Sequence, residues 1–257
     1  INLVFKGLAD FSSEKYIFDF NADITFADFL ELNLFTKHKR SILRGKIDMD
    51  FVGSNPDNIE GEIRFRDAVY INENNIFSFK DFYIKSTAKD SIREVIIDSE
   101  DIINGNIKGN FKFKELPKLA KNSLGSLFAN YQKEEVSKGQ YLDFHFNIYN
   151  KIIEVFYPEV NLGTNTFIKG AIDSDKDIFE LVVKSPEIKA FDVIIDDINL
   201  QVDSKNPLFN TLLNVKDINS DYYRISDVNM VNIVLNDTLL MRTSFVGGYD
   251  KTESFDL

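Results

Sequence analysis

The feature that most constrains the fold is a regular alternation of apolar and polar residues along most of the chain. In residues 16–27 every even position is apolar and most odd positions are polar. The same pattern recurs in residues 46–51, 59–66, 107–113, 142–148 and 198–202. Such alternation is typical of strands with one apolar and one solvated face, as in antiparallel sheets. The sequence therefore predicts an all-β fold.

The strands follow one another without a visible domain break. Polar turn sequences separate them, for example at residues 54–58 and 204–207. A charged residue followed by glycine recurs in phase with the apolar face, and an inward glycine permits a bend or a close backbone approach. These glycines are Gly45, Gly61, Gly109 and Gly170. Repeated strand units favour an open stack over a closed barrel. We expect residues 1–257 to form one continuous segment of a longer protein.

One segment breaks the two-residue period. Between residues 115 and 131 the apolar side chains recur every three or four positions, and Pro117 suits a first helical turn. Gly125 weakens the middle of this segment by about 1 kcal/mol, so packing of the apolar stripe must hold it. The pattern predicts one amphipathic helix over about 115–131, inserted in the sheet.

Composition argues against several classes of function. The chain has 41 acidic and 30 basic residues, a balance that disfavours binding to nucleic acid. It has no cysteine and only two histidines: His145 falls on the polar face of a strand, and His38 falls in a loop expected to be solvated. The acidic turn at 173–177 lacks the glycine and glutamate of a calcium loop. We expect no catalytic residue, no metal site and no cofactor.

The apolar faces leave two architectures open. A second sheet could bury them in a β-sandwich, or one strongly curved sheet could leave its inner face open as a groove. Hydrocarbon chains would suit such a groove, since each buried methylene gains about 0.8 kcal/mol without a specific contact. The residues alone support both architectures equally. No run of 18 apolar residues is present, so neither a signal peptide nor a membrane span is expected within this segment.

The order of the strand sequences in residues 41–128 resembles the TamB (translocation and assembly module) family. The resemblance rests on a series of strand segments that runs into a leucine-rich helix, at residues 45–50, 58–63, 79–82, 93–103 and 108–113. Residues 166–170 and 184–188 fit the same series. The match depends on order and rhythm, because none of these segments is diagnostic alone.

The resemblance implies a fold, a location and partners. TamB-like proteins belong to the AsmA-like group, which is related in architecture to bridge-like lipid-transfer proteins. Their body is a long antiparallel-type β-sheet folded into a trough, a β-taco, with an apolar interior. They are anchored in the inner membrane, reach an Omp85-type barrel in the outer membrane, and are implicated in phospholipid transport and outer-membrane biogenesis. The resemblance thus implies a periplasmic location; the anchor and the domain that meets the barrel are not visible in this segment.

Together these observations predict a segment of a lipid conduit, in which acyl chains lie along the apolar groove. The expected lipid-binding residues alternate along the strands and follow the helical stripe: Ile47, Met49, Phe51, Ile63, Phe65, Phe111, Phe113, Leu116, Leu119, Leu127, Phe128, Phe144, Phe146, Ile148, Ile198 and Leu200. The helix would be a plug or lid, or would simply cap apolar sheet. Two other functions remain open: an assembly module that pairs its sheet edge with strands of outer-membrane proteins, and an extracellular β-sandwich adhesin repeat.

Overall fold

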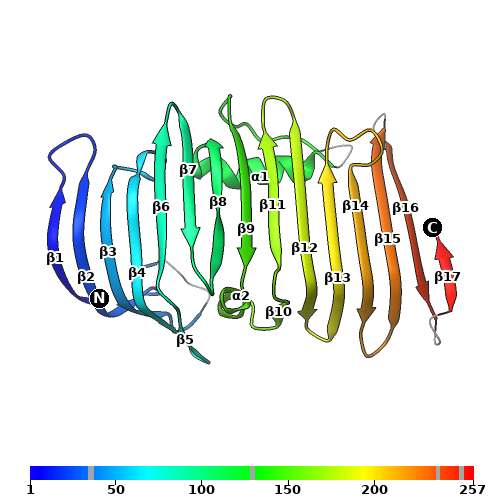
Figure 1. The fold of residues 1–257 in the computed structure, drawn as a ribbon, viewed down its shortest axis with the longest axis horizontal. Helices are drawn as coiled ribbons and strands as arrows, with labels where there is room; N and C mark the ends of the chain where they lie inside the picture. Colours follow the sequence, from blue (N-terminus) through cyan, green and yellow to red (C-terminus); the bar gives the residue numbers. More distant parts are fainter. Residues whose placement is uncertain (34–37, 128–130, 236–237, 249–251) are drawn as a thin grey trace. The chain divides into compact units, whose positions relative to one another are not determined.

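The structure is a computed structural model that describes residues 1–33, 38–127, 131–235, 238–248 and 252–257. The chain is 60% strand and 9% helix, and its strands pair in an open antiparallel sheet (Figure 1). This confirms the all-β prediction. A β-sandwich would need a second sheet packed on the first, and that architecture is not observed.

The chain divides into two compact units, each described by itself below. Unit 1 comprises Ile1–Asn106 and unit 2 comprises Ile107–Leu257, so the division falls within β8 (Ile103–Asn110). The other elements in the described part of unit 1 are seven strands and one 3-10 helix: β1 (Asn2–Asp10), β2 (Ile17–Asp28), β3 (Ile42–Val52), η1 (Pro56–Asn58), β4 (Glu60–Ile71), β5 (Ile76–Ser78), β6 (Phe82–Lys89) and β7 (Ile92–Asp98).

The register of unit 1 brings apolar residues of neighbouring strands onto one face. Met49 in β3 lies opposite Phe20 in β2 and Ile63 in β4, and Ile63 lies opposite Ile84 in β6. Directly opposed residues of antiparallel strands share a face and contact each other. The two-residue period of the sequence therefore becomes a continuous apolar row across four strands.

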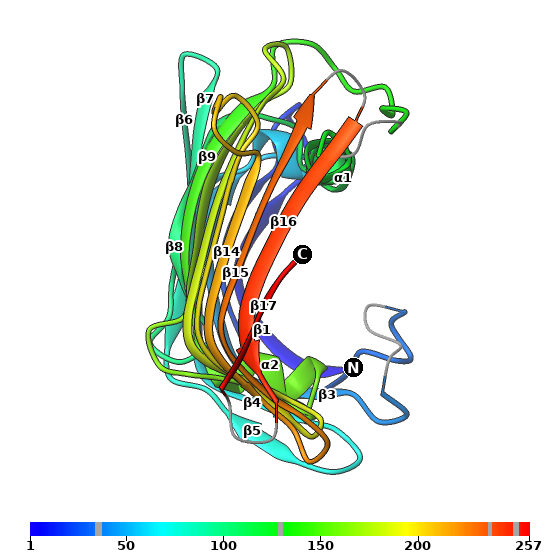
Figure 2. The ribbon, with the colours of Figure 1, turned by 90° about the vertical axis from the view of Figure 1, so that its right-hand side faces the viewer.

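Unit 2 contains both α-helices and the longer run of strands. Its elements are η2 (Phe113–Glu115), α1 (Leu116–Gly125), β9 (Tyr141–Ile148), α2 (Asn150–Phe156), β10 (Val160–Leu162), β11 (Phe167–Asp173), β12 (Ile178–Ala190), β13 (Val193–Asp203), β14 (Thr211–Asn219), β15 (Arg224–Leu235), β16 (Thr238–Gly247) and β17 (Glu253–Asp256). From β11 to β17 each strand pairs with the next along the chain. Strands β12 to β16 are bowed, and α1 and α2 lie on their concave side, near opposite ends (Figure 2).

Helix α1 is shorter than predicted, because it ends at Gly125 and not near residue 131. The backbone N–H of Ser126 caps the last turn on the carbonyl of Asn122. A Cβ on Gly125 would lie 2.3 Å from the ring of Tyr131, so the chain has turned back onto the helix end by that residue. A side chain at residue 125 would therefore displace the ring of Tyr131. Helix α2, which buries Val155, was not predicted from the sequence.

The inward glycines mark close approaches between strands, as the sequence predicts. Gly109 has φ +154°, and a Cβ there would lie 2.1 Å from the carbonyl oxygen of Tyr141 in β9. In unit 1, a Cβ on Gly61 would lie 2.2 Å from the carbonyl oxygen of Asp50. No side chain fits at these distances, and the positive φ is open mainly to glycine.

Two aspartates break the alternation in unit 2. Asp197 in β13 and Asp227 in β15 have φ of 49° and 52°, the left-handed region, within otherwise extended strands. On the far side of Asp227, the side chain of Ile225 lies 3.5 Å from a Cβ built on Gly247, beside the ring of Phe245. The backbone is therefore kinked at Asp227: Ile225, before the kink, and Val228, after it, both lie on the apolar face. The sequence prediction assumed unbroken alternation.

Candidate functional site

Part of the apolar face of unit 2 is covered by α1. The buried residues there, which we call the covered patch, are Phe111, Leu119, Leu142, Ile172, Phe179 and Val202. Leu119 is only 2% exposed and Phe111 only 5%. These side chains are packed core, so the helix stripe meets the sheet face as the sequence pattern indicates, and no ligand reaches Leu119 or Phe111 in this arrangement.

The start of α1 is tied to the chain that follows it by a carboxylate. Glu115 accepts hydrogen bonds from the backbone N–H of Ser137 at 2.7 Å, from the Ser137 hydroxyl at 2.8 Å and from Gln140 Nε2 at 2.6 Å. The two bonds from Ser137, assisted by Gln140 and Lys112, lower the pKa of Glu115 to about 2. The carboxylate form thus holds residues 137–140 against the helix.

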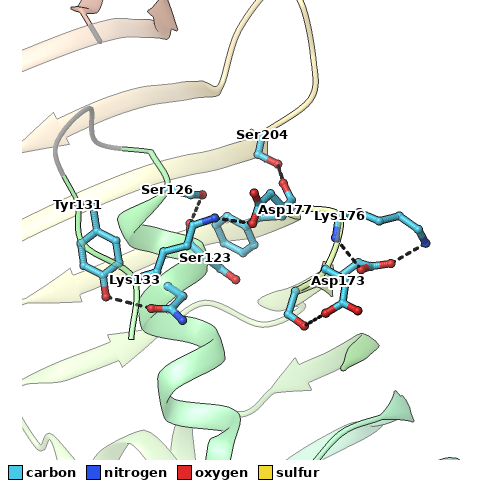
Figure 3. Close-up of polar contacts among 12 residues, drawn as sticks. Ser123, Ser126, Tyr131, Lys133, Asp173, Lys176, Asp177 and Ser204 are labelled. Carbon is cyan, nitrogen blue, oxygen red and sulfur yellow. Dashed lines mark hydrogen bonds and ion pairs between the residues drawn. The ribbon is translucent and has the colours of Figure 1, made fainter. Parts of the chain in front are cut away.

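The residues after α1 form a return segment, residues 131–140, that runs back along the helix. Asn122 donates from Nδ2 to the carbonyl of Glu134 at 2.8 Å and accepts at Oδ1 from the Glu134 N–H at 2.9 Å. Lys133 pairs with Asp177 in the β11–β12 turn, while Tyr131 donates to Asn122 (Figure 3). The return segment therefore ties the helix to the sheet below it.

A cavity of about 100 Å³ lies between α1, the return segment and the β11–β12 turn. Its walls include Leu119, Ser123, Lys133, Ile172 and Phe179. Ligand pockets usually enclose about 300–1,000 Å³. This cavity is therefore too small for a lipid chain.

Beyond the covered patch, the same face continues as an uncovered row of apolar side chains. Each residue lies directly opposite the next on six successive strands, and we call this row the open ladder: Phe146, Ile168, Val183, Leu200, Leu213 and Met230. All six are half-buried. In the described part of unit 2, no second sheet packs over them.

A second row lies on the other side of the kinks at Asp197 and Asp227, nearer the strand ends where α2 lies (Figure 2). It begins at β10 and continues through β12 to β15, and we call it the isoleucine ladder: Leu162, Ile188, Ile195, Ile218 and Ile225. Its members are half-buried as well. Ile225 and Phe245 both lie near a Cβ built on Gly247, and Phe245 is two residues from Thr243, which lies opposite the ladder residue Met230. This row is therefore on the same face as the open ladder.

The opposite face of these strands is polar along its middle. It carries a row of polar residues, each directly opposite the next on strands β12 to β16: Lys184, Asn199, Asn214, Asn229 and Ser244. Asn214 Nδ2 donates to Asn229 Oδ1 at 2.6 Å. The sheet of unit 2 is thus two-sided, with hydrogen-bonding amides on one surface and hydrocarbon on the other.

The predicted lipid-binding residues of unit 2 fall into two sets. Those within or against the covered patch are Phe111, Phe113, Leu116, Leu119, Leu127, Phe144 and Leu200. Phe146 lies in the open ladder, which Leu200 also joins, and half-buried Ile148 and Ile198 lie farther along the same strands. Phe128 lies outside the described residues. The structure therefore brings the helix and strand predictions together in one place, but as core packed between α1 and the sheet.

The predicted residues of unit 1 share a single face of β3 and β4. Ile47 lies opposite Phe65, Met49 opposite Ile63, and Phe51 opposite Gly61. Stacked rings extend this face: the centroids of Phe51 and Phe18, and those of Phe65 and Phe82, are each 4.5 Å apart. The pairing gives unit 1 an apolar face of its own.

The polar candidates are the acidic turn at 173–177 and His38. The 173–177 segment is a hairpin turn in which Lys176 Nζ donates to Asp173 at 2.7 Å. Among the described residues, no group of three His, Asp or Glu side chains could hold a metal ion. His38 is buried, with Nδ1 3.5 Å from a carboxylate oxygen of Glu73, so its predicted solvated position is wrong.

Sequence reasoning missed the isoleucine ladder, although its residues are apolar. The signal was the three-residue step from Ile195 to Ile198 and from Ile225 to Val228, across an aspartate in each case. An aspartate in the left-handed region changes which face the next residues occupy. Such a step could have marked the kink.

Comparison with known proteins adds no relative. No family model, curated protein or solved structure matches this chain. The resemblance to the TamB family therefore stays a prediction. None of the described helices is long and apolar enough to cross a bilayer.

Proposed function

We propose that the chain is a segment of a lipid conduit in which the open face of unit 2 binds the hydrocarbon chains of phospholipids. The open ladder carries this proposal, since six half-buried apolar side chains are aligned across six strands. A continuous apolar surface of this kind is a liability in a protein that binds nothing there.

The chemistry of the face suits a flexible chain better than a polar ligand. The ladder is built from aliphatic side chains, Phe146 and Met230, which offer contact area and no fixed hydrogen-bond geometry. Ten methylene groups laid on such a surface gain at most about 8 kcal/mol before the costs of association. Binding would thus be substantial without selecting a particular head group.

Native mass spectrometry of the purified chain tests this proposal, with Leu213→Asn as the variant and Leu212→Asn as its matched control. The two leucines are neighbours in β14, are both half-buried and point to opposite faces. We expect co-purified phospholipid on the wild-type chain and on L212N, and a loss of about tenfold in bound lipid on L213N.

Equal lipid retention in the two variants would contradict the proposal, as would a wild-type chain free of lipid after purification from membranes. Measuring the unfolding midpoint of both variants separates lost binding from lost structure. Substitution of Phe111 by aspartate would be less informative, because that residue is buried under α1.

The wider setting belongs to the same proposal and rests on the resemblance to the TamB family. In that setting the chain lies in the periplasm of a Gram-negative cell and carries phospholipid between the inner and outer membranes. An inner-membrane anchor and an Omp85-type barrel partner would be contacts of the longer protein. No catalysis, metal or cofactor is invoked.

A second candidate function, sheet-edge pairing with strands of outer-membrane proteins, is favoured by β1. This strand pairs with β2 at one edge of unit 1, and its exposed side chains include Leu3, Val4, Phe5 and Leu8. Long apolar edge strands readily accept another strand. Photo-crosslinkers at Val4 and Leu213 distinguish the functions: protein adducts at Val4 alone favour assembly, and lipid adducts at Leu213 favour the conduit.

A further inference from the structure

Three neighbouring chain segments at one end of the strands of unit 2 carry exposed aromatic side chains. They are the turn after α2, the β12–β13 hairpin and the β14–β15 hairpin. The aromatic edge, as we call it, consists of Tyr157, Phe191, Tyr222 and Tyr223. These side chains are 59%, 80%, 92% and 50% exposed, respectively. Four aromatic side chains with half or more of their surface exposed at one end of a sheet indicate an interaction surface.

The three segments form a single row. The N–H of Phe191 donates to the carbonyl of Glu159 at 3.1 Å, which joins the first hairpin to the turn after α2. Strands β13 and β14 are neighbours, so the two hairpin tips lie about two strand spacings, roughly 10 Å, apart. The rings therefore follow one another along the edge.

Phe191 occupies its place at a conformational cost. Its φ is 54°, in the left-handed region that glycine and asparagine adopt readily and bulky residues avoid. A phenylalanine there is both strained and exposed to water, and neither property stabilises the hairpin. A residue that is both strained and exposed points to an interaction outside this chain.

The shape of the row favours a bilayer over a protein partner. A stable protein interface buries about 800 Å² on each partner, which needs a broad surface and not a line of separate tips. Tyrosine is enriched at the membrane–water interface, where its ring meets the acyl chains and its hydroxyl meets water. Separate tips can each insert there without a complementary surface.

Charge indicates which membrane the row fits. The residues at these segment ends include three acids and two bases: Glu159, Asp192, Asp221, Lys189 and Arg224. This near-neutral balance gives no attraction to an anionic surface. A zwitterionic bilayer is the matching chemistry, and binding would depend little on salt.

We propose that the aromatic edge of unit 2 inserts into the interfacial region of a zwitterionic phospholipid bilayer. The isoleucine ladder lies close to these tips, because Ile188 is three residues from Phe191 and Ile225 is two residues from Tyr223. The edge thereby places the apolar face next to the acyl region. Insertion of the edge is independent of whether the open ladder binds lipid, and L213N leaves it intact.

The chain has no tryptophan, so a single one is a clean reporter. Phe191→Trp places it on the aromatic edge, and Leu208→Trp is the matched control. Leu208 is 79% exposed in the β13–β14 loop, at the other end of β13. With phosphatidylcholine vesicles we expect a blue shift and quenching by brominated acyl chains for F191W, and neither for L208W. Quenching of both reporters, or of neither, overturns the proposal.

Phe191→Asn separates binding from stability. Asparagine tolerates the left-handed region, so F191N is expected to unfold at the same or a higher temperature than wild type. Its binding to phosphatidylcholine vesicles in co-sedimentation is expected to fall about tenfold, and further when Y222S and Y223S are added. Leu208→Ser should bind as wild type does.

Three outcomes would overturn the proposal. They are a wild-type chain that does not sediment with the vesicles, an F191N chain that sediments equally well, and binding that vanishes at high salt. If F191N instead abolishes self-association in sedimentation velocity and leaves vesicle binding unchanged, the edge is a protein interface. Lipid retention by the open ladder is measured separately, so failure of one proposal does not decide the other.

Discussion

The covered patch and the open ladder occupy one face of unit 2 and differ mainly in what lies above them. On the sheet, both consist of apolar residues of neighbouring strands. Over the covered patch, α1 leaves the strand residue Leu142 only 3% exposed, whereas the ladder residue Leu213 stays half-buried. The same alternation therefore yields core in one place and an accessible surface in another.

This difference shows that alternation along a strand predicts which side chains share a face, but not whether that face is buried or exposed. Burial of the patch depends on a helix whose stripe is fastened through Glu115 and the return segment. The ladder has no such cover among the described residues of unit 2. Because the same apolar face is covered at one end and exposed beside it, the exposed part is a candidate binding surface.

The largest expected effect tests the contrast through stability. Leu119→Ala removes a fully buried side chain and should lower the free energy of unfolding by about 2–5 kcal/mol. Leu213→Ala removes a side chain already in contact with water and should cost about 1 kcal/mol. Urea unfolding of both variants measures the difference. Equal losses would mean that the ladder is core as well, and the contrast would fail.

The sequence predicted the fold class and the apolar faces because strand alternation is local and periodic. It also predicted that the helical stripe would be apolar, and Leu116 and Leu119 do pack on the sheet. It could not separate covered from open residues. Phe111 and Phe146 are both flanked by polar residues in the sequence, yet only Phe111 belongs to the covered patch. That patch joins Phe111 to residues distant in the sequence, such as Ile172, and the local pattern does not show these contacts.

The errors of prediction trace to single residues. The helix was extended past Gly125 because the apolar spacing continues to Tyr131, whereas the structure uses that tyrosine to pack on the glycine. The alternation was continued through Asp197 and Asp227, although both adopt the left-handed region. Prediction from periodicity assumes regular helical or extended dihedral angles at every residue. It therefore misses the packing of Tyr131 on Gly125 and the kinks at the two aspartates.

A smaller effect is expected at the kink between the open ladder and the isoleucine ladder. Asp227→Val places a β-branched residue in the left-handed region and should lower stability by about 1–2 kcal/mol. Asp227→Asn should be nearly neutral, because asparagine tolerates this conformation. Thermal unfolding of the pair measures the strain itself. A valine variant as stable as the asparagine variant would show that the kink relaxes and that the two ladders are not fixed in relation to each other.

The smallest effect concerns the fastening of the cover. Hydrogen bonds from Ser137 and Gln140 lower the pKa of Glu115 to about 2 in the folded chain, below its ordinary 4.5. Its stabilising contribution is therefore complete above about pH 4.5 and is lost as the pH falls toward 2. Glu115→Gln removes this pH-dependent part, since the amide does not titrate and only its oxygen can accept a hydrogen bond; Glu135→Gln, at an exposed position of the return segment, is the matched control. Unfolding by urea from pH 7 to pH 2 gives both profiles. If the E115Q profile matches wild type, the carboxylate does not fasten the cover, and the patch must be held by Leu119 and its apolar neighbours alone.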